Sequence, residues 1–377
     1  LNIAMMMSIT DKQDLVYYLN CTGQEEEKLF QCAARVRNQH LGNNVYLRGL
    51  IEFSNICRKN CLYCGIRREN SPLVRYELTD QEVLAAARYA WQAKYGSIVI
   101  QSGERNDRSF VLRIEALVKK IKQLTNQQLG ITLSLGEQCA ETYQRWFDAG
   151  AHRYLLRIET SRESLYKKIH PNDSLHSFTT RLQCLEHLQK CGYKTGSGVM
   201  IGLPFQTTED LADDLSFLKS IHIDMVGMGP YLEHESTPLY TCRQSLLSTT
   251  ERLRLSIHMV ACLRLLMPHI NIAATTALQA INPLGREKAI AAGANVIMPN
   301  ITPFSNRRNY KLYPNKPCIE EGAEEALRLL SENIAACECR IAWNEWGDPQ
   351  KAGCTDLAAK PITPDVPESG RVQKPIK

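Results

Sequence analysis

The sequence predicts an α/β protein in which eight strands alternate with helices and close into a (β/α)8 barrel of the TIM type. Three observations favour this fold. Short apolar or β-branched runs recur along most of the chain, amphipathic helical patterns separate them, and several of these patterns end at a glycine. The length of 377 residues suits one barrel with extensions. A partial barrel or an open, doubly wound sheet is the alternative.

The predicted strands are short, as buried strands in parallel sheets usually are. They cover residues 45–53, 97–101, 131–135, 154–158, 198–202, 224–228, 270–275 and 295–298. The helical patterns between them cover residues 80–94, 110–124, 137–149, 178–191, 208–220, 249–266 and 283–292. The first of these helices starts with a capping signal at Thr79, and Gly150, Gly192 and Gly293 follow three of the others, as helix C-termini prefer.

Four segments are expected along the chain. Residues 1–44 form an N-terminal extension with a helix at 25–40, and residues 45–316 form the barrel. Residues 317–347 form a C-terminal segment with a helix at 319–334. The last part, residues 348–377, is rich in Pro, Lys and Gly and is expected to be a disordered tail.

Composition and charge exclude several classes of function. Hydrophobic residues make up 44% of the chain and charged residues 23%, which is ordinary for a soluble globular protein. The net charge of +5 is too diffuse to indicate nucleic-acid binding. No apolar run approaches the ~20 residues of a membrane span, and the N-terminus lacks the basic region of a secretory signal. We therefore expect a cytoplasmic protein, with an organelle presequence left open.

Three of the fourteen cysteines form a pattern with ligand spacing, CxxxCxxC at Cys57, Cys61 and Cys64. Thiolates this close together converge on one metal centre. Iron–sulfur clusters normally take four thiolates, so three leave one iron open to a non-protein ligand, as reactive metal sites require. A zinc site is less favoured because no nearby His or Cys completes a tetrahedral set. A metal-free loop is the other alternative.

The position of these cysteines supports a reactive centre. They directly follow the first predicted strand and therefore lie at the C-terminal face of the barrel, where barrel active sites are found. Arg58 and Lys59 add positive charge beside the thiolates.

This cysteine pattern resembles that of the radical S-adenosylmethionine (SAM) superfamily, and further motifs resemble the HydE family of FeFe-hydrogenase maturation enzymes. The matching stretches are RGLIEFSN at 48–55, QSGE at 101–104, TLSLGE at 132–137, RYLLRIET at 153–160, TGSGVMIGLP at 195–204 and ATTAL at 274–278. The resemblance spans about residues 40–318, with methylornithine synthase and biotin synthase as cousins. It implies one 4Fe-4S cluster on the three cysteines, with the SAM amino and carboxylate groups on the open iron. One electron from the cluster then splits SAM into methionine and a 5′-deoxyadenosyl radical.

The resemblance assigns three SAM contacts. Tyr63 takes the aromatic position near the adenine, Arg181 holds the SAM carboxylate, and Met200 lies along the adenosyl group. Without the resemblance, Arg181 reads as a surface arginine and Met200 as core filler.

Further SAM contacts are predicted from the residues at strand ends. Gly103 allows close backbone approach to the SAM ammonium beside Glu104, unless it marks a plain turn. Arg157 and Glu159 lie on one face at the end of the fourth strand and suit a zwitterion, or else form a buried structural salt bridge. The family commonly has His where Ile158 stands here, which weakens any role for that position.

Small hydroxyl groups at the barrel mouth predict the rest of the pocket. Ser134 ends the third strand and is assigned to SAM, whereas Thr275, Thr276 and Met298 end the seventh and eighth strands and are assigned to the substrate. An exposed Thr at a strand end is also common without any function. Tyr310, on the loop after the eighth strand, is a candidate lid residue.

A second iron–sulfur cluster is not expected. Some members of the family bind one through three cysteines spread over a dozen residues after the barrel. Here Cys318 stands at the first position, residues 319–326 contain no cysteine, and Cys337 and Cys339 follow much later.

The resemblance implies a radical SAM enzyme acting in assembly of the hydrogenase H-cluster. Its substrate is then a small iron–cysteine complex carrying CO and cyanide that a partner maturase makes, and its reductant is a ferredoxin or flavodoxin. Two alternatives stay open. One is isomerisation of lysine to methylornithine, which calls for extra charged groups in the pocket. The other is a non-catalytic iron–sulfur electron carrier, which would more naturally use four cysteines and needs no large barrel.

Overall fold

Eight parallel strands form the centre of the molecule in the computed structural model, which describes residues 7, 9–313, 316 and 323–349. They are β1 (Asn44–Ser54), β2 (Ser97–Ser102), β3 (Gly130–Ser134), β4 (Arg153–Leu155), β5 (Lys194–Ser197), β7 (Met225–Val226), β9 (Asn271–Ile272) and β10 (Val296–Ile297). Their order in the sheet is β10-β1-β2-β3-β4-β5-β7-β9. A parallel bridge between Ala273 and Val296 joins the two end strands, and the Ala274 N–H donates to the Val296 carbonyl at 2.9 Å. The sheet therefore curls round until its first and last strands meet.

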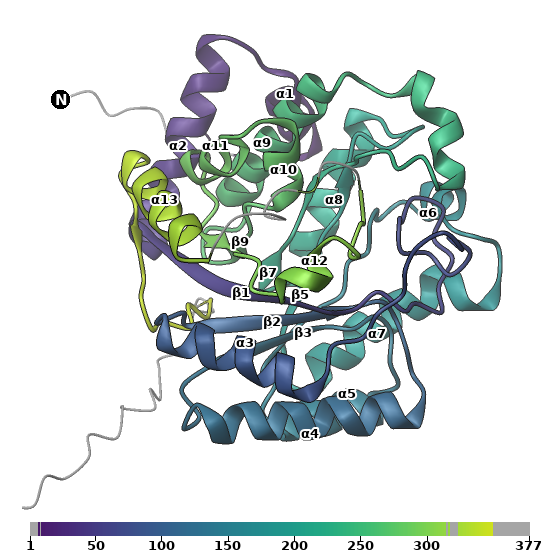
Figure 1. Cartoon of the computed structure of the whole chain (residues 1–377). Coiled ribbons are helices and arrows are strands. Elements are labelled where there is room, and N and C mark those ends of the chain that lie inside the picture. The colour runs from purple at the N-terminus through teal and green to yellow at the C-terminus, as the bar shows by residue number, and fades with distance from the viewer. Residues whose placement is uncertain (1–6, 8, 314–315, 317–322, 350–377) are drawn as a thin grey trace, which may run out of the picture.

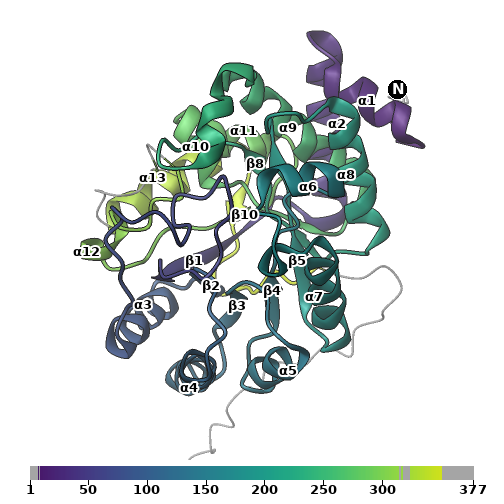
Figure 2. The ribbon, with the colours of Figure 1, turned by 90° about the vertical axis from the view of Figure 1, so that its right-hand side faces the viewer.

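Helices surround the strands (Figures 1 and 2). They are α3 (Asp80–Gln92), α4 (Arg108–Leu124), α5 (Ala140–Asp148), α7 (Phe178–Lys190), α8 (Thr208–Ser220), α9 (Thr249–Leu266) and α11 (Gly285–Ala291). Thr79 caps α3 through a complete capping box with Glu82, as its sequence predicts. The predicted barrel of the TIM type is confirmed. None of the described helices has the length and apolar character that crossing a bilayer demands.

Two N-terminal helices, α1 (Lys12–Asn20) and α2 (Gln24–Leu41), pack on the outside of the barrel. Helix α2 lies against α9, and α1 lies against α8 and α9 (Figure 1). A buried histidine of α9 fixes this contact, because His258 Nε2 lies 2.6 Å from Glu26 Oε1. The predicted helix at 25–40 is thus present, and α1 adds a second one.

The fifth strand begins earlier than predicted. Strand β5 has the sequence KTGS, which holds no large apolar residue, so the pattern pointed instead to residues 198–202. The chain then continues as β6 (Met200–Ile201), which pairs with β8 (Gly229–Pro230) in a small separate sheet. A Cβ on Gly198 would lie 1.9 Å from the Gly227 carbonyl oxygen, so the two segments come this close only because Gly198 has no side chain.

Several short helices had no counterpart in the sequence prediction. They are α6 (Glu163–Ile169), η1 (Ser174–His176), η2 (Pro238–Ser245), α10 (Thr276–Ile281) and α12 (Phe304–Arg307). Each is shorter than the window over which helical periodicity becomes distinct from chance.

The end of the described chain closes the N-terminal side of the barrel. After α13 (Ala323–Ala336), β11 (Arg340–Ile341) pairs with β1. Residues 343–348, here called the strap, then lie against the starts of the strands, at the left of the molecule in Figure 1. The Trp346 indole stacks on His152 with ring centroids 4.4 Å apart, and Asp348 forms an ion pair with the fully buried Arg153 at 2.6 Å. The expected tail starts at 348, but Asp348 is part of this closure. Residues 350–377 lie outside the described residues.

Trp346→Ala should loosen the strap. The change removes the His152 stacking, the Lys122 ammonium 4.6 Å from the indole centroid, and the hydrogen bond to the Gln128 carbonyl. We expect a loss of about 2 kcal/mol in the free energy of unfolding, measured by urea denaturation. Burial lowers the pKa of His152 to about 4, so NMR titration of the variant should show that pKa rising toward its ordinary value of 6.5.

The matched control is Trp343→Ala, because Trp343 is 41% exposed. Equal losses of stability in the two variants, with an unchanged pKa for His152, would contradict this account of the strap.

Candidate active site

The cysteine loop, residues 55–68, begins where β1 ends and lies at the C-terminal side of the barrel. Backbone hydrogen bonds hold it at three places. The Arg58 N–H donates to the Glu104 carbonyl at 2.9 Å, the Leu62 N–H to the Ile169 carbonyl at 3.0 Å, and the Glu104 N–H to Cys57 Sγ at 3.3 Å. The loop is therefore attached both to the end of β2 and to the end of α6.

The three thiols lie close to one another and are partly buried. Burial raises the pKa of Cys57 and Cys64, and it raises the pKa of Cys61 to about 12. Repulsion from the neighbouring cysteines raises the pKa of Cys61 and Cys64 further, whereas Arg181 and Lys59 favour the Cys61 thiolate. Buried thiols of this kind become thiolates when a cation binds them, so the donor set fits an iron–sulfur cluster.

No three His, Cys, Asp or Glu side chains in the described part of the chain are grouped to hold a single metal ion. A 4Fe-4S cluster does not need such a grouping, because each thiolate binds a different iron.

Gly103 is needed for the packing of the cysteine loop on β2. A Cβ at this position would lie 2.4 Å from the Ile56 carbonyl oxygen and 2.8 Å from Cys57 Cβ. The glycine thus brings the start of the loop against the strand end, which is a closer approach than a turn alone would require.

Charged side chains form a connected network around the cysteine loop. Glu104 accepts from Arg58 Nε at 2.9 Å and from the Glu137 N–H at 2.9 Å. Glu137 in turn lies 2.7 Å from Lys59 Nζ and 2.5 Å from Arg181 Nε. Burial alone would raise the pKa of Glu137, but Arg181 and Lys59 lower it below its ordinary value. The Glu104 carboxylate is thus already hydrogen bonded to Arg58 of the cysteine loop and to the Glu137 backbone.

Arg157 and Glu159 form an ion pair with each other, with Arg157 Nε 3.0 Å from both carboxylate oxygens. Arg157 Nη2 also donates to the Val199 carbonyl at 2.8 Å. Strand β4 ends before them, and Glu159 has a positive φ of 68° that lets its backbone pair with residues 198–200. The salt-bridge interpretation thus describes the chain as it stands, and Ile158 between them is fully buried.

Tyr63 and Met200, predicted to line the adenosyl group, belong to one apolar cluster. Met200 packs with five other buried residues, and Tyr63 lies against them; the five are Leu165, Ile169, Leu203, Tyr231 and Leu239. The Tyr63 hydroxyl lies 3.3 Å from His170 Nε2. Helix α6 therefore supplies one side of this apolar wall.

The predicted substrate residues lie in different parts of the barrel. Thr276 Oγ1 lies 2.8 Å from the Tyr313 hydroxyl, and Thr275 Oγ1 donates to the Met228 carbonyl at 3.2 Å. Met298 lines a cavity of about 20 Å³ inside the barrel, together with Arg48, Thr132 and eight other residues. Ser134 ends β3 and is partly exposed. Tyr310 is only 1% exposed, so it is part of the interior wall.

A groove of about 820 Å³ opens beside the cysteine loop. Its walls include Asn70, Leu73, His234 and Lys311, and the Gly65 N–H donates to the Leu312 carbonyl at 3.2 Å along its edge. Among the described cavities, this groove has the lining residue nearest to the cysteines along the chain, Asn70.

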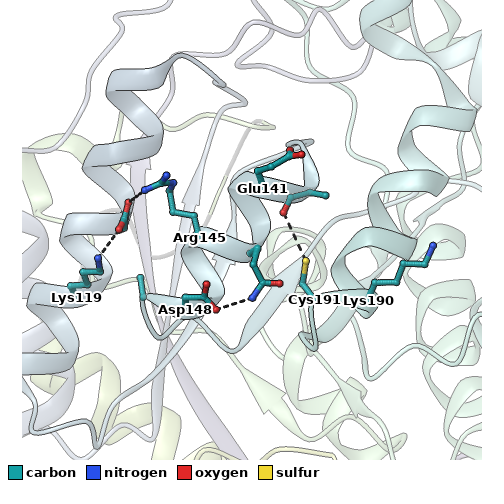
Figure 3. Close-up of a pocket in the computed structure, with 10 residues that line it drawn as sticks. Lys119, Glu141, Arg145, Asp148, Lys190 and Cys191 are labelled. Atoms are coloured by element: carbon teal, nitrogen blue, oxygen red, sulfur yellow. Dashed lines mark hydrogen bonds and ion pairs between the residues drawn. The ribbon is translucent and has the colours of Figure 1, made fainter.

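A second hollow, of about 690 Å³, lies on the outer helices α4, α5 and α7 (Figure 3). Charged side chains line it, and Glu115 pairs there with both Lys119 and Arg145 at 2.6 Å. None of the predicted site residues lines this hollow.

Three site residues escaped the sequence analysis. His176 Nε2 accepts the Asn60 N–H at 2.9 Å, and its Nδ1 lies 2.6 Å from Asp173. His170 contacts Tyr63, and Glu137 joins the charged network. These contacts connect segments about 80 to 120 residues apart, so no local pattern marks them. The sequence TLSLGE contained Glu137 but gave it no partner.

Cys337 and Cys339 lie away from the barrel mouth. Cys337 and Cys339 lie between α13 and β11, and Cys339 is buried with its Sγ 3.3 Å from the Cys337 carbonyl. Cys318 lies outside the described residues.

Comparison with known proteins agrees with this geometry. Residues 51–218 match the model of the radical SAM superfamily. The [FeFe] hydrogenase maturase subunit HydE of Thermotoga maritima is 47% identical over 322 residues, which cover 85% of this chain and 88% of that protein. The chain belongs to the HydE family of radical SAM enzymes.

More distant relatives of this HydE-family chain follow the same fold. The 3-methylornithine synthase of Methanosarcina acetivorans is 28% identical, with 79% of this chain and 82% of that protein covered. Two solved structures, methylornithine synthase (PylB) and the maturase HydG from Carboxydothermus hydrogenoformans, superpose with TM-scores of 0.75 and 0.73. The PylB superposition covers 90% of this chain and 95% of the PylB chain, at 23% sequence identity. The HydG superposition covers 89% of this chain and 76% of the HydG chain, at 18% sequence identity. These two likenesses show the fold.

Asp214 of α8 fixes the backbone that follows Glu159. Its Oδ1 accepts from the Ser161 N–H at 2.6 Å and from the Ser161 hydroxyl at 2.7 Å. Burial raises the pKa of Asp214 from 3.8 to about 7, in spite of these hydrogen bonds.

This carboxyl group should make stability depend on pH. It holds its proton more tightly in the folded chain, so its contribution is full below about pH 4 and is lost as the pH rises through about 7. Asp214→Asn keeps the acceptor and removes the titration. Between pH 5 and pH 8, its free energy of unfolding should fall by about 2–3 kcal/mol less than that of the unsubstituted chain. Urea denaturation at both pH values measures this, with the exposed Asp213→Asn as control; equal pH dependence in all three proteins would refute it.

Proposed function

We propose that this HydE-family enzyme reductively cleaves SAM to a 5′-deoxyadenosyl radical and acts in maturation of an FeFe hydrogenase. One observation carries the proposal. Three partly buried thiols lie together at the barrel mouth in a chain that is 47% identical to the HydE maturase of Thermotoga maritima over most of its length. Methylornithine synthase is a weaker candidate, because its sequence is only 28% identical.

We assign the cluster to Cys57, Cys61 and Cys64, and we propose that it is the only one. When bound, a 4Fe-4S cluster supplies the single electron that divides SAM. The chain's part is to hold the three thiolates in place, through the backbone bonds of the cysteine loop, and to leave one iron without a protein ligand. The Glu104 N–H on Cys57 Sγ stabilises negative charge there.

We propose that the charged network binds the polar groups of SAM and that the apolar cluster binds its adenosyl group. We assign the SAM carboxylate to Arg181. Its Nε donates to Glu137 and its Nη1 to the Arg157 carbonyl, so we propose Nη2 as the donor to the SAM carboxylate. We assign the binding of the adenosyl group to Tyr63 and Met200, which lie in one apolar cluster. The ammonium and the remaining polar groups go to the mouth residues Gly103, Glu104, Ser134, Arg157 and Glu159.

The substrate is proposed to be a small iron–cysteine complex supplied by a partner maturase, bound near Thr275, Thr276, Met298 and Tyr310. The enclosed barrel keeps water from a reactive carbon radical, and the strap contributes by closing the N-terminal side. A ferredoxin or flavodoxin is the proposed reductant.

Anaerobic reconstitution with iron and sulfide tests this function. Reduction with dithionite in the presence of SAM should yield 5′-deoxyadenosine, and Cys61→Ala should abolish the product because it removes one ligand of the cluster. Cys139→Ala, which changes an exposed cysteine, is the matched control. Intact SAM and an unperturbed cluster EPR signal in the unsubstituted enzyme would refute the proposal. Turnover of lysine to methylornithine would favour the weaker candidate.

The number of clusters can be counted directly. The reconstituted enzyme should hold about four irons per chain, since one cubane cluster contains four. Cys318→Ser and the double variant Cys337→Ser/Cys339→Ser should not change this count, whereas Cys57→Ser should lower it. About eight irons, reduced to about four by Cys318→Ser, would contradict the single cluster.

A further inference from the structure

Glu137 joins the cysteine loop to the proposed SAM carboxylate site. Its two carboxylate oxygens lie on different cations, Oε2 at 2.7 Å from Lys59 Nζ and Oε1 at 2.5 Å from Arg181 Nε. Lys59 lies between two of the cysteines, Glu137 follows β3, and Arg181 belongs to α7. One buried carboxylate thus connects three separate parts of the barrel mouth.

The remaining hydrogen bonds of this triad leave its members little freedom. Lys59 Nζ also donates to the Leu175 carbonyl, and Arg181 Nη1 donates to the Arg157 carbonyl at 2.5 Å. All three side chains are buried, with at most 8% of any of them exposed. Burying charged side chains costs desolvation free energy. A buried ion-pair triad is therefore better explained by the geometry that it fixes than by a gain in stability.

We propose that Lys59 and Glu137 are positioning residues that set where the cluster lies relative to the carboxylate of bound SAM. Glu137 aims the Arg181 guanidinium, and Lys59 ties the cysteine loop to the same carboxylate. The proposal rests on the function given above, because it presupposes that Arg181 binds SAM. It gives a specific role to Lys59, which the sequence marked only as a positive charge beside the thiolates, and to Glu137, which had no assigned partner.

The two charges should act on the cluster in opposite directions. A reduced cluster carries one more negative charge than an oxidised one, so a nearby cation favours reduction and a nearby anion opposes it. Loss of the Lys59 charge should therefore lower the midpoint potential of the cluster. Loss of the Glu137 charge should raise it. Damage to the fold alone would not produce shifts of opposite sign.

The test compares Lys59→Met, Glu137→Gln and the double variant in the reconstituted enzyme. Both single variants should weaken SAM binding about 10- to 100-fold by calorimetry, since each frees one end of the triad. The potential, measured by EPR-monitored titration without SAM, should fall in Lys59→Met and rise in Glu137→Gln. The double variant should return close to the unsubstituted potential while SAM binding stays weak. Lys59→Arg should restore the potential.

Lys122→Met and Asp348→Asn are the matched controls, because they change a buried lysine and the carboxylate partner of a buried arginine at the opposite end of the barrel. Neither should alter SAM affinity or potential. The inference is overturned if the Lys59 and Glu137 variants bind SAM as the controls do, or if both potentials move the same way. If Lys59→Met does not hold iron, Glu137→Gln decides by the same two measurements. An unsubstituted enzyme that binds no SAM would instead overturn the proposed function.

Discussion

The cysteine loop must keep three thiols close together in a partly buried place, where water stabilises their charges less than it would at the surface. Burial raises the pKa of all three thiols; repulsion from Cys57 raises the pKa of Cys61 further, and repulsion from Cys61 and Cys57 raises the pKa of Cys64 further. The loop therefore needs hydrogen bonds to other parts of the chain, and three segments provide them. The end of β2 reaches it through Glu104, α6 through the Ile169 carbonyl, and the following turn through His176. The barrel can thus be regarded as a frame that supports this one loop.

Much of that frame follows from local pattern. All eight strands alternate with helices as the sequence predicts, because buried apolar runs and capped amphipathic helices are local signals. The exceptions have identifiable causes. Strand β5 carries small residues where large apolar ones would mark it, and α6 is too short to show periodicity. The strap depends on pairs such as Arg153–Asp348, which are 195 residues apart in sequence, so composition indicated a disordered tail at Asp348.

Patterns in the sequence marked the proposed ligands of the site, but they marked few of the side chains that hold those ligands in place. Spacing alone singled out the cysteines, and motif resemblance singled out Tyr63, Arg181 and Met200, two of which the structure places in one cluster. Arg157 and Glu159 pair with each other, which was the structural alternative left open by the sequence. Glu137 and His176 could not be found, because their importance lies in partners that only the closed barrel brings near.

Ion pairs between a carboxylate and buried cations stabilise both sides of the barrel, but they have different consequences on each side. On the N-terminal side, Asp348 faces Arg153 in a strap that covers the strand starts. At the mouth, Glu137 divides its carboxylate between Lys59 and Arg181. One carboxylate shared by two cations leaves net positive charge, and that charge lies beside the thiols. Positive charge at the mouth favours both an anionic cluster and the carboxylate of a bound ligand there.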